Sequence, residues 1–204
     1  DTDPQWVGLR ATVLPVLTQL KQQSVVRADA LAVMGNRDRL TFAGLVSLVE
    51  RFSAAFQRYG IESGSVAGVM FANPVRHLVA SLALLDLRAT QVALSPREVQ
   101  TIRRTLAIKS GVEILITDME SHKTAPGNPT IRVGDDWGLS ISYGVGQLPA
   151  MRKANPSEEL QPAMFFMGSG TTGAPKLIAP SFDLFSNLIA RDLSVRSLSP
   201  GERH

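Results

Sequence analysis

The sequence predicts an α/β protein built on a doubly wound, mainly parallel sheet with helices on both faces. Between residues 66 and 117, apolar runs of strand length alternate with amphipathic runs of helix length. The connections between these runs are short, which favours right-handed crossovers and a sheet that is covered on both sides. A length of 204 residues, of which 44% are hydrophobic, is enough for one such domain with its own core.

Three elements are predicted before this alternation begins. Residues 4–23 carry apolar side chains at helical spacing, and Pro15 inside the segment predicts a kink or a break. Two short apolar runs around a polar turn predict a β-hairpin over residues 31–42. The apolar stripe of residues 45–59 predicts a helix that ends at Gly60, since glycine readily adopts the left-handed conformation that ends many helices.

The alternating region predicts three strands and two helices. The strands are expected at residues 66–71, 90–94 and 112–117, and the helices at residues 74–85 and 96–110. Asn73 is the expected N-cap of the first of these helices, and Pro74 its first residue. Leu78 belongs to the apolar stripe of this helix. His77 falls on the opposite side, which favours a solvated surface histidine over a catalytic one.

The order is weaker after residue 119, where glycine, proline, serine and asparagine become frequent. Short strands are predicted at residues 130–133 and 139–143, and a buried strand at residues 163–167. An apolar stretch at residues 177–179 predicts one more strand. Ser181 is then the expected cap of a final helix.

The segment that follows residue 167 contains six residues without a large side chain, Gly168-Ser169-Gly170-Thr171-Thr172-Gly173. Its glycines permit positive φ and allow several backbone N–H groups to converge on one point. Ser169, Thr171 and Thr172 add hydroxyl donors, and Lys176 adds a positive charge. These groups together suit a polyphosphate. The same composition is also typical of a flexible surface turn that binds nothing.

A second kind of phosphate loop carries its lysine directly after the last glycine, at the start of a helix. In this chain Ala174 and Pro175 separate Gly173 from Lys176, and the residues that follow have strand character. The sequence therefore disfavours that second kind and predicts a strand–strand connection.

The residues from Ser169 to Lys176 resemble the Ser-Gly-Thr-Thr-Gly-x-Pro-Lys signature of adenylate-forming ligases. This family includes acyl-CoA synthetases, luciferase-like enzymes and nonribosomal-peptide adenylation domains. Leu40-Thr41-Phe42-Ala43-Gly44-Leu45 is similar to a second family pattern. Gly168 and Leu177, which flank the signature, depart from the residues that are usual in the family.

The resemblance implies ATP-dependent activation of a carboxylic acid, with Mg²⁺, to an acyl-adenylate and pyrophosphate. It also implies acyl transfer to the thiol of coenzyme A or of a carrier-protein phosphopantetheine. The phosphate-binding residues that it implies are Ser169, Gly170, Thr171, Thr172, Gly173 and Lys176.

The resemblance covers only the first part of the family pattern. Residues 1–204 are therefore expected to form the N-terminal, three-layer part of an AMP-binding domain. The rest of the large domain and the C-terminal domain are expected to be absent, and with them every catalytic residue. We expect this chain alone to be inactive and expect it to self-associate through surface exposed by truncation. A non-catalytic nucleotide-binding module and an inert folded fragment are the alternatives.

The composition excludes several other classes of function. The net charge is only +3 and the basic residues are scattered, which argues against a nucleic-acid surface. Cysteine is absent and the three histidines are far apart, so no metal site is expected. No signal peptide and no membrane span are predicted, which favours a cytoplasmic protein.

Overall fold

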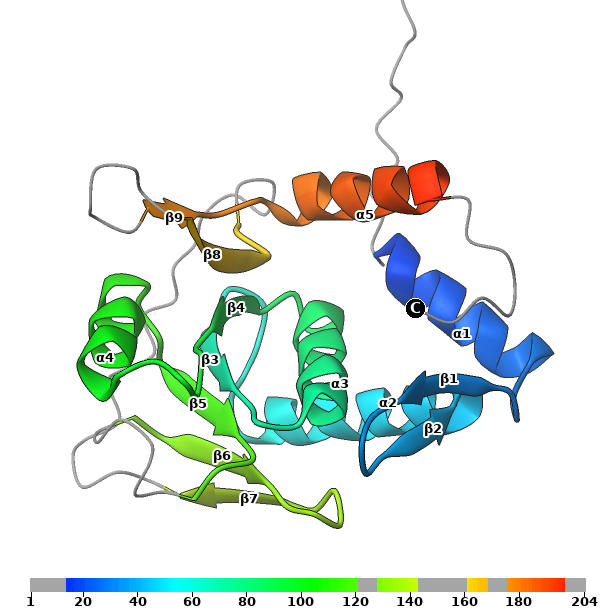
Figure 1. Cartoon of the computed structure of the whole chain (residues 1–204), viewed down its shortest axis with the longest axis horizontal. Coiled ribbons are helices and arrows are strands. Elements are labelled where there is room, and N and C mark those ends of the chain that lie inside the picture. The colour runs from blue at the N-terminus through cyan, green and yellow to red at the C-terminus, as the bar shows by residue number, and fades with distance from the viewer. Residues whose placement is uncertain (1–13, 121–127, 143–160, 169–175, 197–204) are drawn as a thin grey trace, which may run out of the picture.

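The computed structural model describes residues 14–120, 128–142, 161–168 and 176–196. In these ranges a seven-stranded sheet has the order β7-β6-β5-β3-β4-β8-β9, and β1 and β2 form a separate hairpin (Figure 1). The strands are β1 (Leu31–Met34), β2 (Arg39–Thr41), β3 (Val66–Met70), β4 (Thr90–Ala93), β5 (Ile114–Thr117), β6 (Thr130–Val133), β7 (Leu139–Ser142), β8 (Met164–Gly168) and β9 (Lys176–Ile178). The helices are α1 (Pro15–Val26), α2 (Phe42–Arg58), α3 (Pro74–Asp86), α4 (Gln100–Lys109) and α5 (Phe182–Arg196).

The sheet is parallel through its centre and antiparallel at both edges. Strand β3 pairs in parallel with both β4 and β5, β4 with β8, and β5 with β6. The edge strands β7 and β9 run antiparallel to β6 and β8. The chain passes from β3 through α3 to β4, and then through α4 to β5 on the other side of β3. The predicted doubly wound, mainly parallel α/β fold is therefore confirmed.

Each face of the sheet has its own core, because successive side chains of a strand point to opposite faces. Val69 and Ile116 pack in the larger core with residues of α2 and α3. Met70 and Leu115 pack in a smaller core with Leu106 of α4. In Figure 1, α2 and α3 accordingly lie to the right of the central strands and α4 to the left.

Two predicted boundaries are wrong, each for a local reason, and a third is tested only in part. Pro15 is the first residue of α1, where its missing N–H is tolerated; the predicted kink or break is not tested further, because residues 4–13 lie outside the described ranges. Phe42 begins α2 and is not part of a strand, because Thr41 caps the helix by accepting a hydrogen bond from the Gly44 N–H. Helix α4 begins only at Gln100, since a turn that starts at Ser95 comes first.

The predicted cap of helix α3 is confirmed, but the prediction of which side chains of this helix are buried is partly wrong. The Asn73 side chain accepts hydrogen bonds from the N–H groups of Val75 and Arg76. Leu78, which was expected to be buried, is 38% exposed, whereas Arg76 is only 6% exposed. Arg76 is buried because its guanidinium forms an ion pair with Asp135 at 2.7 Å, which gives the buried charge a partner.

Candidate functional site

The candidate site is the connection between β8 and β9. Gly168, the last residue of β8, pairs with Lys176, the first residue of β9. Because β8 runs parallel to β4 and β3, its C-terminal end faces the same edge of the sheet as theirs. Ligands of open α/β sheets bind at the carboxyl ends of parallel strands. Strand β8 thus ends at the side of the sheet where ligands of this fold class commonly bind.

The strand–strand connection predicted from the sequence is confirmed, and the alternative loop that opens a helix directly after its glycines is excluded. The next helix, α5, starts only at Phe182. Ser181 caps it as predicted, with its hydroxyl oxygen 3.2 Å from the Leu184 nitrogen. Lys176 lies at the start of β9, and its side chain is outside the description. The other predicted phosphate-binding residues also lie outside the described ranges: Ser169, Gly170, Thr171, Thr172 and Gly173.

The base of this hairpin is fastened to the turn between α3 and β4. The Gln161 side-chain amide donates a hydrogen bond to the Arg88 carbonyl oxygen, with an Nε2–O distance of 2.6 Å. The Thr90 hydroxyl donates to the carbonyl oxygen of Pro162 at 2.7 Å. The N–H of Ala163 donates to the carbonyl oxygen of Pro180, which joins the two arms of the hairpin at 2.8 Å. Sequence reasoning missed these contacts.

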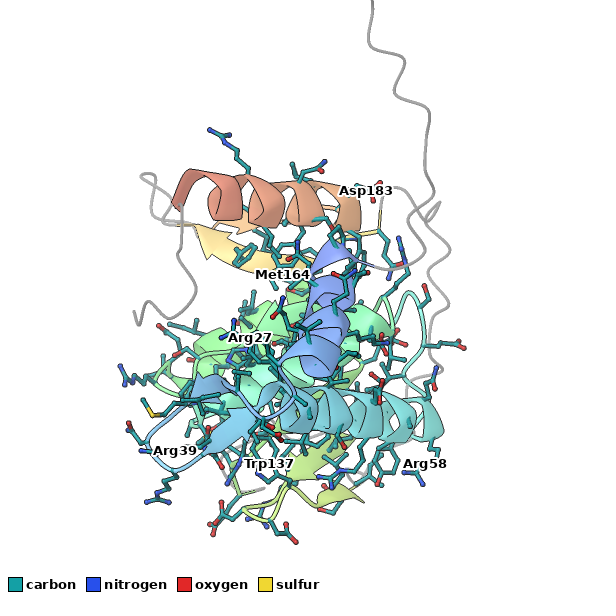
Figure 2. The ribbon with its side chains drawn as sticks, turned by 90° about the vertical axis from the view of Figure 1, so that its right-hand side faces the viewer. Arg27, Arg39, Arg58, Trp137, Met164 and Asp183 are labelled. Atoms are coloured by element: carbon teal, nitrogen blue, oxygen red, sulfur yellow. The ribbon has the colours of Figure 1, made fainter. Side chains whose placement is uncertain are left out.

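The views of Figures 1 and 2 agree on the place of this hairpin. In both, β8, β9 and α5 lie at one end of the molecule, and β6 and β7 lie at the other. Figure 2 shows Met164 of β8 and Asp183 of α5 toward one end of the molecule and Trp137 toward the other. The candidate site therefore belongs to one end of the sheet.

A second position on the sheet also fits the general rule for ligand binding. The connections from β3 and β5 lead to opposite sides, so a crevice is expected between the carboxyl ends of these two strands. Asp118, directly after β5, accepts hydrogen bonds there from the N–H groups of Ala72 and Asn73, each at 2.9 Å. The chain's own carboxylate therefore binds the amides that precede α3, and an anionic ligand would have to displace it.

His77 lies close to this crevice and is not the solvated surface histidine that the sequence suggested. Its ring stacks on Phe71 with 5.9 Å between the ring centroids. Burial lowers the pKa of His77 below its usual value of 6.5, and the negative charge of Asp118 opposes that shift. The imidazole packs as an aromatic ring beside Phe71.

Two kinds of site are not found in the described ranges. No group of three or more histidine, cysteine, aspartate or glutamate side chains lies close enough together there to hold a metal ion. No helix among the described residues has the length and apolar character needed to cross a bilayer.

Comparison with known proteins assigns the chain to a family. Residues 20–196 match the sequence profile of the AMP-binding enzymes, and the chain belongs to this family of adenylate-forming ligases and adenylation domains. It is 28% identical over 174 residues to a salicyl-AMP ligase / salicyl-S-ArCP synthetase of Mycobacterium tuberculosis. It is 26% identical over 148 residues to the anguibactin system regulator of Vibrio anguillarum. These alignments cover 76% and 72% of this chain, but only 31% and 14% of the two relatives.

Solved structures show the same fold. O-succinylbenzoate coenzyme A synthetase (MenE) from Bacillus subtilis, in complex with AMP, aligns with a TM-score of 0.67 at 19% identity. The N-terminal subdomain of NpsA from Klebsiella oxytoca aligns with a TM-score of 0.65 at 17% identity. The alignments cover 88% and 87% of this chain, and 46% and 44% of the respective structures. The chain thus spans less than half the length of these structures.

Proposed function

We propose that this chain supplies the phosphate-binding part of an ATP-dependent ligase that activates a carboxylic acid. Membership of the AMP-binding enzyme family supports the proposal. The observation that carries it is the pairing of Gly168 with Lys176, which makes the glycine- and threonine-rich segment a strand–strand connection at the ligand-binding edge of the sheet.

In the proposed reaction a carboxylate oxygen attacks the α-phosphorus of ATP. The bond between that phosphorus and the oxygen bridging to the β-phosphorus breaks, and pyrophosphate leaves with the electron pair. The backbone N–H groups of residues 170–173, the hydroxyls of Thr171 and Thr172, and the Lys176 ammonium would bind the β- and γ-phosphates. Each charge-assisted contact is worth roughly 1.5–3 kcal/mol.

Magnesium would reach such a site with its nucleotide. The described residues include no ligand cluster for a metal, and Mg²⁺ is commonly held by substrate phosphates with one or two carboxylates. A MenE structure of the same fold contains ATP and a magnesium ion.

The acceptor of the acyl group is proposed to be a thiol of coenzyme A or of a carrier protein. Support comes from the names of the relatives, which include a salicyl-S-ArCP synthetase and several nonribosomal peptide synthetases. We also propose that residues 1–204 form an N-terminal part of the AMP-binding domain and that the catalytic residues of the whole enzyme lie outside them.

Titration calorimetry with magnesium–ATP tests the proposal. We expect the wild-type chain to bind with a dissociation constant of about 1 mM, because the site holds only the phosphates. Lys176→Ala should weaken binding about tenfold or more, since it removes a charge-assisted contact. Lys109→Ala, which removes an exposed lysine at the end of α4, is the matched control and should have no effect. Equal affinity of the wild-type and Lys176→Ala chains would refute the assignment of this lysine.

A further inference from the structure

Three helices of this chain end in the same backbone motif, and only one of them does so without glycine. After α2, α3 and α4, the residue in the left-handed conformation is Gly60 (φ 86°), Arg88 (φ 54°) and Gly111 (φ 70°). At α3 the Arg88 N–H donates to the carbonyl of Leu85, and the Ala89 N–H to that of Leu84. This is the Schellman pattern, in which glycine is usual because a Cβ atom is disfavoured at positive φ.

The Arg88 side chain contacts the segment that follows the candidate hairpin. Its guanidinium carbon lies 5.1 Å from the centroid of the Phe182 ring. Phe182 is the first residue of α5 and is 1% exposed. The Nε atom of Arg88 is buried and has no hydrogen-bond partner among the described residues. The Arg88 side chain thus reaches the start of α5 through its cation–π contact with Phe182.

The Arg88 backbone contacts the segment that precedes the same hairpin. Its carbonyl oxygen accepts the 2.6 Å hydrogen bond from the Gln161 side chain, and Gln161 is only 4% exposed. The direction of this carbonyl depends on the left-handed conformation of Arg88. One residue thus holds the chain three residues before β8 and four residues after β9.

A second non-glycine residue with positive φ also takes part in an arginine–aromatic contact. Among the described residues, Trp137 is the other non-glycine residue with positive φ, at 65°. The Arg76 guanidinium carbon lies 5.8 Å from the centroid of its ring. Both strained residues therefore belong to a cation–π pair, an interaction that strengthens when it is shielded from water.

We propose that Arg88 is a positioning residue that fixes the base of the β8–β9 hairpin against the central sheet. Its ring contact and its carbonyl hold both arms, so that the strand ends at Gly168 and Lys176 keep one orientation. The link from this clamp to phosphate affinity rests on the proposed function; the clamp itself does not.

Hydrogen exchange of the full chain without ligand tests the clamp. Arg88→Gln keeps the backbone strain and removes the cation, whereas Arg88→Lys keeps both. We expect amides of residues 161–168 and 176–182 to exchange about three- to thirtyfold faster in Arg88→Gln, the range that loss of a cation–π contact implies. Arg88→Lys should restore most of the protection, and exchange in β3 should not change.

Arg88→Gly separates local positioning from global stability. It removes the side chain and also relieves the strain, so we expect the equilibrium constant for folding to stay the same or to rise. Exchange at the hairpin should nevertheless be faster than in the wild type. Two results would overturn the proposal: unchanged exchange at the hairpin in Arg88→Gln, or faster exchange confined to α3 and β4, which would indicate an ordinary helix cap.

Pyrophosphate titration then tests the link to the site. The dissociation constant should rise in Arg88→Gln by a factor similar to the change in exchange and return in Arg88→Lys. Arg58→Gln, which removes a positive charge at the end of α2, should leave it unchanged. Faster exchange with unaltered pyrophosphate affinity would overturn the positioning role. A wild-type chain that binds no pyrophosphate would instead refute the proposed function, while the exchange comparison would still decide the clamp.

Discussion

The Asp118 carboxylate accepts a hydrogen bond from the backbone N–H of Asn73, 45 residues earlier in the chain, at 2.9 Å. It accepts a second bond from Ala72 at the same distance. Because Asn73 is itself the cap of α3, Asp118 ties the end of β5 to the start of this helix. The pair joins two neighbouring connections at the carboxyl edge of the sheet, and its carboxylate already binds the amides that an anion would need there.

Removal of the Asp118 carboxylate should destabilise the fold. We expect Asp118→Ala to lower the free energy of unfolding by about 1–3 kcal/mol, since two backbone donors lose a charged acceptor. Asp118→Asn should lose less, because its amide oxygen still accepts one bond. Urea denaturation at pH 7 measures both changes. A loss below about 0.5 kcal/mol in Asp118→Ala would mean that water replaces the carboxylate without penalty.

His77 should make stability depend on pH on the acidic side of neutrality. Its pKa in the folded state is lowered, mainly by burial, from the value of 6.5. The unfolded state therefore binds more protons, so stability is fully present above pH 6.5 and is lost as the pH falls through 6.5 toward the folded pKa. His77→Phe keeps an aromatic partner for Phe71 and should flatten this slope.

Proton NMR of the imidazole tests the same group directly. His77 should titrate below 6.5 in the wild type, and lower still in Asp118→Asn, because the opposing carboxylate charge is gone. A midpoint at or above 6.5, or one that rises in Asp118→Asn, would contradict the described environment.

Glu113 should make stability depend on pH in the opposite direction to His77. Burial raises its pKa, with a further rise from the charge of Glu62, while a hydrogen bond from the Val66 N–H opposes the shift. The folded state therefore holds the proton more tightly, and stability is lost as the pH rises from 4.5 through the folded pKa. Glu113→Gln keeps an acceptor for Val66 but does not ionise. Its stability relative to the wild type should increase between pH 4 and pH 7, as measured by urea denaturation; a relative decrease would show that the charged form is the favoured one.

The chain alone should not form acyl-adenylates. Phosphate-binding groups contribute to the rate only when the α-phosphorus and the carboxylate are held together, and we propose that the groups that do so lie outside residues 1–204. Acid-dependent exchange of labelled pyrophosphate into ATP should therefore stay at background with a panel of carboxylic acids. Exchange above background that is lost in Lys176→Ala would show that the catalytic groups are within this chain.

The alternating part of the fold was predictable because local pattern and burial agree there. The strands from Val66 to Thr117 carry apolar residues for both cores, and Asn73 provides a cap that can be recognised from sequence. Pro15 fits a helix start as well as a break within a helix, and it begins α1. The burial of Arg76 depends on Asp135, which lies 59 residues further along, and no local pattern reveals such a partner.

The motif of the candidate site and its place between two strands could be predicted from the sequence. The contacts that hold the surrounding segments could not. Lys176 was expected next to a strand, and it begins β9. Asp118 could have been noted as an acidic residue directly after a buried strand. The role of Arg88 could not be predicted, because arginine is rare in the left-handed conformation. Gln161, whose side chain donates to the Arg88 carbonyl oxygen, is also 73 residues away in the sequence.

Residue-resolved NMR with pyrophosphate tests the central claim, that residues 168–176 form the phosphate site, most directly. In a titration of the ¹⁵N-labelled chain, the account predicts amide shifts confined to residues 168–176, with half-saturation at about 1 mM. These shifts should be lost in Lys176→Ala and kept in Lys109→Ala. Shifts at residues 72–76 in their place would move the site to the crevice that Asp118 occupies. No shift at roughly tenfold that concentration would contradict a phosphate site in this chain.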